Sequence, residues 1–120
     1  MRDFTRLDIW QRSRALAAQL VALDIRSSRH RAPGLLSQIR RAAMSIPANI
    51  AEGCGHDSPQ EFVRFLSIAV GSAMELESHL LLARETALIP RARVDALLAE
   101  TIAIRRMTDR LRGVVRSSPS

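Results

Sequence analysis

The segment 38–53, with the sequence QIRRAAMSIPANIAEG, carries two lines of residues at helical spacing. At about 100° per residue, one side of such a helix collects apolar residues, namely Leu35, Ile39, Ala42, Ala43, Ile46 and Ile50. A side this wide and this apolar must be buried against other helices. We therefore expect a helix over residues 35–51 at the centre of an all-helical domain.

A polar line runs beside this apolar side. Its members are mostly short hydrogen-bonding residues spaced three or four apart, namely Gln38, Arg41, Ser45, Asn49 and Glu52. One interpretation is a hydrogen-bond network that fixes how two helices pair, because buried polar groups need partners. The other is a binding site for a ligand or for nucleic acid. We favour the network, because buried polar networks outside functional sites are common.

Proline and glycine residues are expected to shape the same helix. Pro47 has no N–H to donate to the Ala43 carbonyl, which predicts a kink. The Ser45 hydroxyl is placed to satisfy that carbonyl or a neighbouring one. Gly53 and Gly55 follow the last apolar residue, and we expect them to end the helix in left-handed conformations.

Three further segments show helical periodicity, over residues 7–27, 59–86 and 91–116. A basic loop over residues 28–34, a glycine-rich turn and Pro90 separate the four helices. Ser58, Pro59 and Glu61 form a capping box at the start of the third helix. The pattern predicts an all-α chain of four helices in one domain over residues 1–116, with a disordered tail at 117–120.

The third helix is apolar on more than one side. A second apolar line, about 100° from its main stripe, consists of Val63, Val70, Met74 and Leu81. We expect another copy of the chain to cover this line, because exposed apolar patches usually mark interfaces. Glu77 lies between the two lines and needs a partner, for which Arg40 and Arg41 are the candidates.

The charge of the chain points to a polyanionic partner. The formal net charge is +6, and all 18 basic residues are arginines. Arginine suits phosphate, so nucleic acid is the natural partner, although a GC-rich gene would also replace lysine by arginine. Aromatic residues make up 3% of the chain, so we expect backbone contacts rather than base stacking. The residues expected to make these contacts are Arg105, Arg106, Arg110, Arg112, Arg40 and Arg41.

Other classes of function lack support in the sequence. The single Cys54 excludes an internal disulfide and a cysteine-built zinc site. There is no glycine-rich phosphate loop, catalytic triad or repeated Glu-x-x-His motif, so we expect no enzyme, no metal and no cofactor. The N-terminal segment does not resemble a signal peptide, and no apolar run reaches the ~20 residues of a spanning helix. A cytoplasmic protein without a membrane segment is expected.

Residues 2–17 and 34–80 contain motifs of a known family, and the most specific is SIPANIAEG followed by EFVRFL and GSAMELE. The chain resembles the small four-helix-bundle proteins encoded in intervening sequences of bacterial 23S rRNA genes. These are related to the accessory variability proteins of diversity-generating retroelements. The resemblance covers residues 3–86, and the fourth helix matches in pattern only. The motif positions in this chain are Gln38, Arg41, Ser45, Pro47, Asn49, Glu52, Gly53, Gly71, Ser72, Glu75 and Glu77.

The resemblance implies an all-α, antiparallel up-and-down four-helix bundle that assembles into a ring, typically a homopentamer, with a basic surface. In the retroelement branch the ring binds nucleic acid and a reverse transcriptase, whereas the role of the ribosomal-RNA branch, to which this sequence is closer, is not established. Two hypotheses about function follow. The first is a ring-forming accessory protein that binds RNA or DNA backbone with little sequence specificity. The second is a non-enzymatic oligomeric scaffold for a protein partner such as a reverse transcriptase.

Overall fold

The computed structural model describes residues 2–23 and 33–118. A short 3-10 helix precedes four α-helices, in the order η1 Phe4–Arg6, α1 Asp8–Ala22, α2 Pro33–Cys54, α3 Pro59–Glu85 and α4 Arg91–Ser117. The described part of the chain contains no strand. The prediction of an all-α fold is therefore confirmed.

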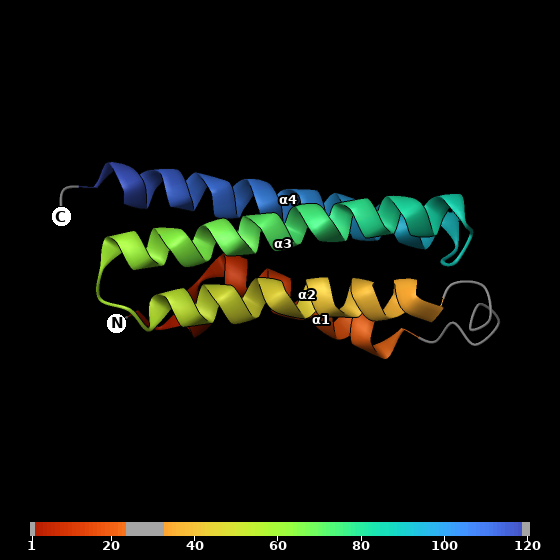
Figure 1. Cartoon of the computed structure of the whole chain (residues 1–120), viewed down its shortest axis with the longest axis horizontal. Coiled ribbons are helices and arrows are strands. Elements are labelled where there is room, and N and C mark those ends of the chain that lie inside the picture. Colours follow the sequence, from red (N-terminus) through yellow and green to blue (C-terminus); the bar gives the residue numbers. More distant parts are fainter. Residues whose placement is uncertain (1, 24–32, 119–120) are drawn as a thin grey trace.

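Each helix runs antiparallel to the one before it, and α1 lies against α4 to close the bundle (Figure 1). The chain forms a rod of 51 × 20 × 19 Å. α1 has 15 residues whereas α3 and α4 have 27 each, so α1 is about 22 Å long beside helices of about 40 Å. The up-and-down bundle is confirmed, with one helix that covers part of its length.

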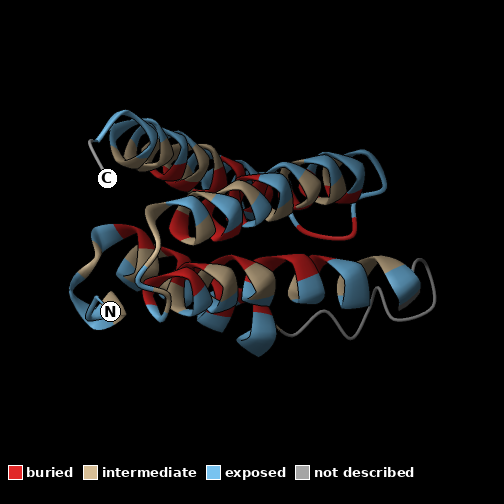
Figure 2. Cartoon of the chain, turned by 60° about the vertical axis from the view of Figure 1, so that its left-hand side comes forward, coloured by how far each residue is buried: buried red, intermediate tan, exposed pale blue. Residues whose placement is uncertain are grey.

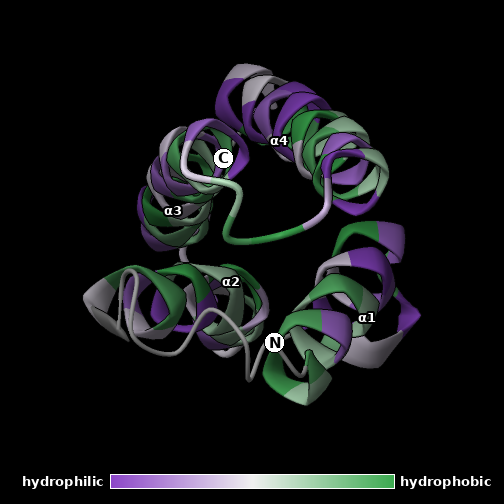
Figure 3. Ribbon diagram, turned by 90° about the vertical axis from the view of Figure 1, so that its right-hand side faces the viewer, coloured by the Kyte–Doolittle hydropathy of each residue, from purple (hydrophilic) through white to green (hydrophobic). Residues whose placement is uncertain are grey.

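One continuous core runs between the four helices (Figure 2). The predicted apolar stripes supply it, and its fully buried members include Leu16, Leu20, Ile39, Ile46, Ile50, Leu66, Leu76, Leu80, Val94 and Ile104. Leu88 and Ile89, in the connection between α3 and α4, are also buried. Seen end-on, this apolar connection turns inward across the end of the bundle (Figure 3). It closes the core at the end where α1 stops short.

The predicted start of α3 is confirmed, although the Glu61 carboxylate accepts a hydrogen bond from Arg64 at 3.2 Å and is not seen to close the predicted capping box. Ser58 is the N-cap, and its Oγ accepts a hydrogen bond of 3.3 Å from the backbone N–H of Glu61. Pro59 occupies the first turn, where its missing N–H costs nothing. α4 begins at Arg91, directly after Pro90, as the sequence predicts.

The ends of α1 and α2 differ from the prediction. α1 was expected to reach residue 27 but ends at Ala22, and Leu23 is extended with φ −64° and ψ 122°; residues 24–27 lie outside the described residues. The sequence predicts that Pro33 and Gly34 belong to the preceding loop, but they form the first turn of α2. Proline is tolerated there because the first helical N–H groups have no partner inside the helix.

The C-terminal boundary is also later than predicted. α4 includes Ser117, which the sequence placed in a disordered tail, and Ser118 caps the helix. The hydroxyl of Ser117 donates to the Gly113 carbonyl at 2.9 Å. Residues 119 and 120 of the predicted tail lie outside the described residues.

Gly53 does not end α2 in a left-handed conformation, and that prediction is wrong. No glycine in the described residues has positive φ, and α2 continues through Gly53 to Cys54. Gly53 is required for space instead, since a Cβ there would lie 2.9 Å from Phe65 Cβ and 3.0 Å from Phe62 Cδ1. α2 and α3 therefore approach closely at this point.

Candidate nucleic-acid interface

The centre of the polar line on α2 forms a hydrogen-bond network with α3. Ser45 Oγ and Ser72 Oγ lie 2.8 Å apart, and Asn49 Nδ2 donates to Ser45 Oγ at 3.0 Å and to the Ser45 carbonyl at 2.8 Å. The Ser45 hydroxyl thus bonds across the helix pair and to Asn49. These contacts support the interpretation of the line as a network that fixes helix pairing.

The ends of the polar line are more exposed. Arg41 Nη2 donates to Gln38 Oε1 at 2.7 Å and lies 3.8 Å from Glu75 Oε2 on α3. His79 Nε2 lies 3.8 Å from the same oxygen and is buried without a hydrogen-bond partner among the described residues. Glu52, at the other end, is exposed. Arg41 is therefore loosely held and accessible to a phosphate.

Arg40, a predicted nucleic-acid contact, is engaged within the chain. Its Nε donates to the Leu20 carbonyl at 3.2 Å, and its Nη2 donates to the Leu23 carbonyl at 2.8 Å. Carbonyls at the end of a helix lack partners inside it, and a cation there also favours the helix dipole. Arg40 therefore caps α1 from the neighbouring helix.

Glu77 pairs with Arg105 on α4, and the prediction of Arg40 or Arg41 as its partner is wrong. Arg105 Nε lies 2.6 Å from Glu77 Oε2, and Arg105 Nη2 lies 3.5 Å from Glu77 Oε1. Both side chains are half-buried. Arg40 and Arg41 belong to α2, whereas Glu77 lies on the side of α3 that faces α4. Arg105, another predicted nucleic-acid contact, thus joins α4 to α3.

Arg112 also bonds within the bundle. It pairs with Asp109 on its own helix, and its Nη1 donates to Ser67 Oγ of α3 at 3.2 Å. A phosphate at this position would compete with a carboxylate that is already in place.

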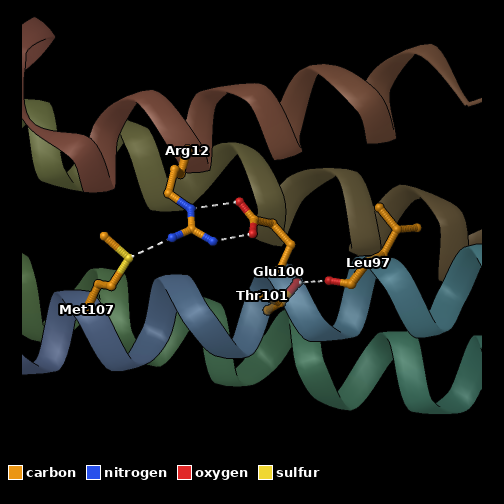
Figure 4. Close-up of polar contacts among 5 residues, drawn as sticks. All are labelled: Arg12, Leu97, Glu100, Thr101 and Met107. Atoms are coloured by element: carbon orange, nitrogen blue, oxygen red, sulfur yellow. Dashed lines mark hydrogen bonds and ion pairs between the residues drawn. The ribbon is translucent and has the colours of Figure 1, made fainter.

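An ion pair between Arg12 and Glu100 joins α1 to α4, and the sequence did not predict it. Arg12 Nε donates to Glu100 Oε2 at 3.0 Å, and Arg12 Nη1 lies 3.0 Å from Met107 Sδ (Figure 4). The hydrogen bond with Glu100 raises the pKa of Arg12, while burial opposes that rise. The indication of this pair in the sequence is the position of its members, because each residue flanks the apolar stripe of its helix.

Arg106 and Arg110 are the predicted contacts that remain unpaired. They lie one turn apart on the outer side of α4, and both are exposed. Neither forms an ion pair or hydrogen bond with another residue within 2–23 and 33–118. Arg110 also borders a shallow apolar groove between α1 and α4, lined by Leu7, Asp8, Ile9, Met107, Leu111 and Val114. Two guanidinium groups therefore face solvent with their donors available.

Cys54 is a buried thiol rather than an exposed one. It is fully buried at the end of α2, and burial raises the pKa of its thiol. Within the described residues, no group of three or more His, Cys, Asp or Glu side chains could hold a metal ion. The position of Cys54 suits packing, because a nucleophilic thiol needs access and a lowered pKa.

We expect Cys54 to react with iodoacetamide about 100-fold more slowly in the native chain than in the chain unfolded by urea. The reaction is followed by the mass of the intact protein over time at one pH. The unfolded chain serves as the reference for an accessible thiol of ordinary pKa. Equal rates in the two states would show that the thiol is open to solvent and not buried.

The chain is similar to a known protein family and to a solved structure. The profile of the 23S rRNA-intervening sequence protein family matches residues 5–110, which includes most of α4 and extends past the predicted limit at residue 86. A crystal structure of a protein with unknown function, from the S23 ribosomal protein family from Bacteroides thetaiotaomicron, is similar with a TM-score of 0.78. It is 25% identical, and the alignment covers 87% of this chain and 97% of that chain. A search of the curated proteins gives no match. This chain belongs to the family of 23S rRNA-intervening sequence proteins.

Proposed function

We propose that this protein is an oligomeric, basic four-helix bundle that binds the phosphate backbone of RNA or DNA through the outer side of α4. The observation that carries the proposal is the pair Arg106 and Arg110, exposed one turn apart and without an acidic partner in the described part of the chain. A guanidinium group presents a fork of donors that fits phosphate oxygens. Unpaired arginines can bind a phosphate without first breaking an internal ion pair.

Binding of this kind has little sequence specificity. The aromatic rings that could stack on bases are engaged within the chain: Phe4 lies edge-on to Trp10 at 5.0 Å, and Phe65 stacks on His56 at 5.2 Å. Phe62 is buried beneath the guanidinium of Arg2. Contacts to the backbone therefore dominate, and the affinity falls as the salt concentration rises.

The double variant R106E/R110E is expected to bind a labelled RNA duplex and the matching DNA about tenfold more weakly than the native chain. The slope of log affinity against log salt should become less steep by about 2, because two phosphate contacts are lost. The matched control is R91E/R93E, which changes the charge of α4 equally at its other end. The control should bind within about threefold of the native chain.

Two outcomes would contradict the proposed surface. If both double variants lose affinity equally, net charge and not the Arg106–Arg110 face controls binding. If R106E/R110E keeps native affinity and slope, the arginines on α4 are not the contacts. Circular dichroism of both variants shows whether the helices are intact.

Oligomerisation would repeat the α4 surface several times on one particle. Linked weak contacts raise the overall affinity without any new contact. The family resemblance implies a ring, typically a homopentamer, of this 13.3-kDa chain. Sedimentation equilibrium in the binding buffer tests this part of the proposal. An oligomer that binds neither RNA nor DNA at physiological salt would instead favour a scaffold for a protein partner such as a reverse transcriptase.

A further inference from the structure

The outward side of α3 carries more apolar surface than the bundle needs. Ile68, Met74, Leu81 and Leu82 are 40%, 57%, 44% and 46% exposed. α3 is also long and apolar enough to cross a bilayer. The core helices of soluble proteins can meet the same two criteria of length and composition. The most apolar window of α3, however, is only 39% buried. Large apolar side chains gathered on one exposed helix side are typical of an interface.

Small residues occupy the middle of this side. Gly71 is exposed, and a Cβ at this position would meet no atom within 4 Å. Ser78, two turns later, is also exposed. A glycine inside a helix destabilises it by about 1 kcal/mol relative to alanine, and no contact among the described residues requires it here. Small residues between large apolar ones leave room for a second helix to approach.

Three pairs of residues on this side lie symmetrically about the midpoint between Met74 and Glu75. Within each pair, the two residues lie at equal distances on either side of that midpoint. The pairs are Gly71 with Ser78, Ile68 with Leu81, and Arg64 with Glu85. At about 100° per residue, the midpoint lies directly opposite the buried stripe of α3. An antiparallel copy of α3, related by a twofold axis at this point, would place each residue at the level of its counterpart.

The charges at the two ends favour the antiparallel arrangement. Arg64 would face Glu85 of the second copy at both ends, whereas a parallel copy would bring like charges together. Arg64 is now held by Glu61 at 3.2 Å, an exposed pair that contributes little. Glu85 is exposed and has no ion pair within the described ranges. Glu75, beside the axis, has Arg41 at 3.8 Å as its own counter-ion.

We propose that the outward side of α3 binds the same side of α3 in a second copy of this chain, antiparallel, about a twofold axis between Met74 and Glu75. The inference goes beyond nucleic-acid binding, because it uses a different helix. A bilayer fits less well, since Arg64 and Glu75 would enter the hydrocarbon. A twofold contact closes at two copies, so it is separate from any contact that builds a ring.

Charge reversal tests the pairing of Arg64 with Glu85. The variants Arg64→Glu and Glu85→Arg are each expected to self-associate about tenfold more weakly than the native chain, because like charges meet at both ends of the pair. An equimolar mixture of the two variants should regain native association, because the mixed dimer has opposite charges at both ends. The matched control, Arg93→Glu on α4, should associate like the native chain. Sedimentation equilibrium without nucleic acid measures the association, because the contact doubles the mass of the particle.

A second measurement is independent of charge. Met74→Cys should be joined into covalent dimers by a short bismaleimide, because the two side chains lie beside the axis, and buried Cys54 should not react. The proposal is overturned if the native chain does not show this doubling of mass, or if the mixture of Arg64→Glu and Glu85→Arg associates as weakly as either variant alone. It is also overturned if Met74→Cys forms no covalent dimers, or if the native chain floats with phosphatidylcholine vesicles.

Discussion

Replacing Leu76 by alanine is expected to lower the free energy of unfolding by about 3 kcal/mol. Leu76 lies on the core side of α3 and is fully buried. Truncation removes its transfer free energy and leaves a cavity that the closely packed helices fill only in part. Urea unfolding followed by circular dichroism gives the change, with the slope of the transition checked for two-state behaviour.

Met74→Ala provides the matched control on the same helix. Met74 lies two residues before Leu76 but on the outward side, with 57% of its surface exposed. Its truncation should change the free energy of unfolding by no more than about 0.5 kcal/mol in dilute solution. If the two substitutions had equal effects, the orientation of α3 described above would be wrong.

Gly53→Ala is expected to lower the free energy of unfolding by about 2 kcal/mol. Alanine normally stabilises a helix relative to glycine. At this position the new Cβ would lie 2.9 Å from Phe65 Cβ and 3.0 Å from Phe62 Cδ1. The Phe65 atom is next to the backbone of α3, so it cannot move unless the helix moves. The clash should therefore outweigh the gain in helix propensity, as measured by the same urea titration.

Gly113→Ala, on α4, separates the steric effect from the conformational one. Both glycines lie within helices, and neither has positive φ. A Cβ at Gly113 would meet no atom within 4 Å. This substitution should raise the free energy of unfolding by about 0.5 to 1 kcal/mol. Stabilisation by both substitutions would show that α2 and α3 are farther apart at Gly53 than described.

Local chemistry made some boundaries predictable and others not. The start of α3 follows from Ser58 and Pro59, which act on the backbone within one turn. The end of α1 depends on Arg40, which bonds its last carbonyls from another helix, and no local window of sequence shows this. Leu88 and Ile89 interrupt the helical pattern, so they predicted a break. Their burial depends on how the connection turns inward.

The candidate interface was predictable in position but not in detail. Periodicity placed arginines on the outer half of α4, yet it could not separate free residues from paired ones. Arg105 and Arg106 are adjacent in sequence but point in directions about 100° apart, so Arg105 meets Glu77 and Arg106 meets solvent. Which helix supplies a partner is a property of tertiary packing.

Because Arg40 on α2 bonds the carbonyls of Leu20 and Leu23, α1, the shortest of the four α-helices described, depends on a longer one while the chain folds. An isolated helix of 15 residues is marginal in water. The pair of α2 and α3 is joined by a short turn and therefore closes at a lower entropic cost than contacts across the longer connection after α1. The α2–α3 hairpin should form first, and α1 should gain hydrogen-exchange protection last, when it docks beside its cap.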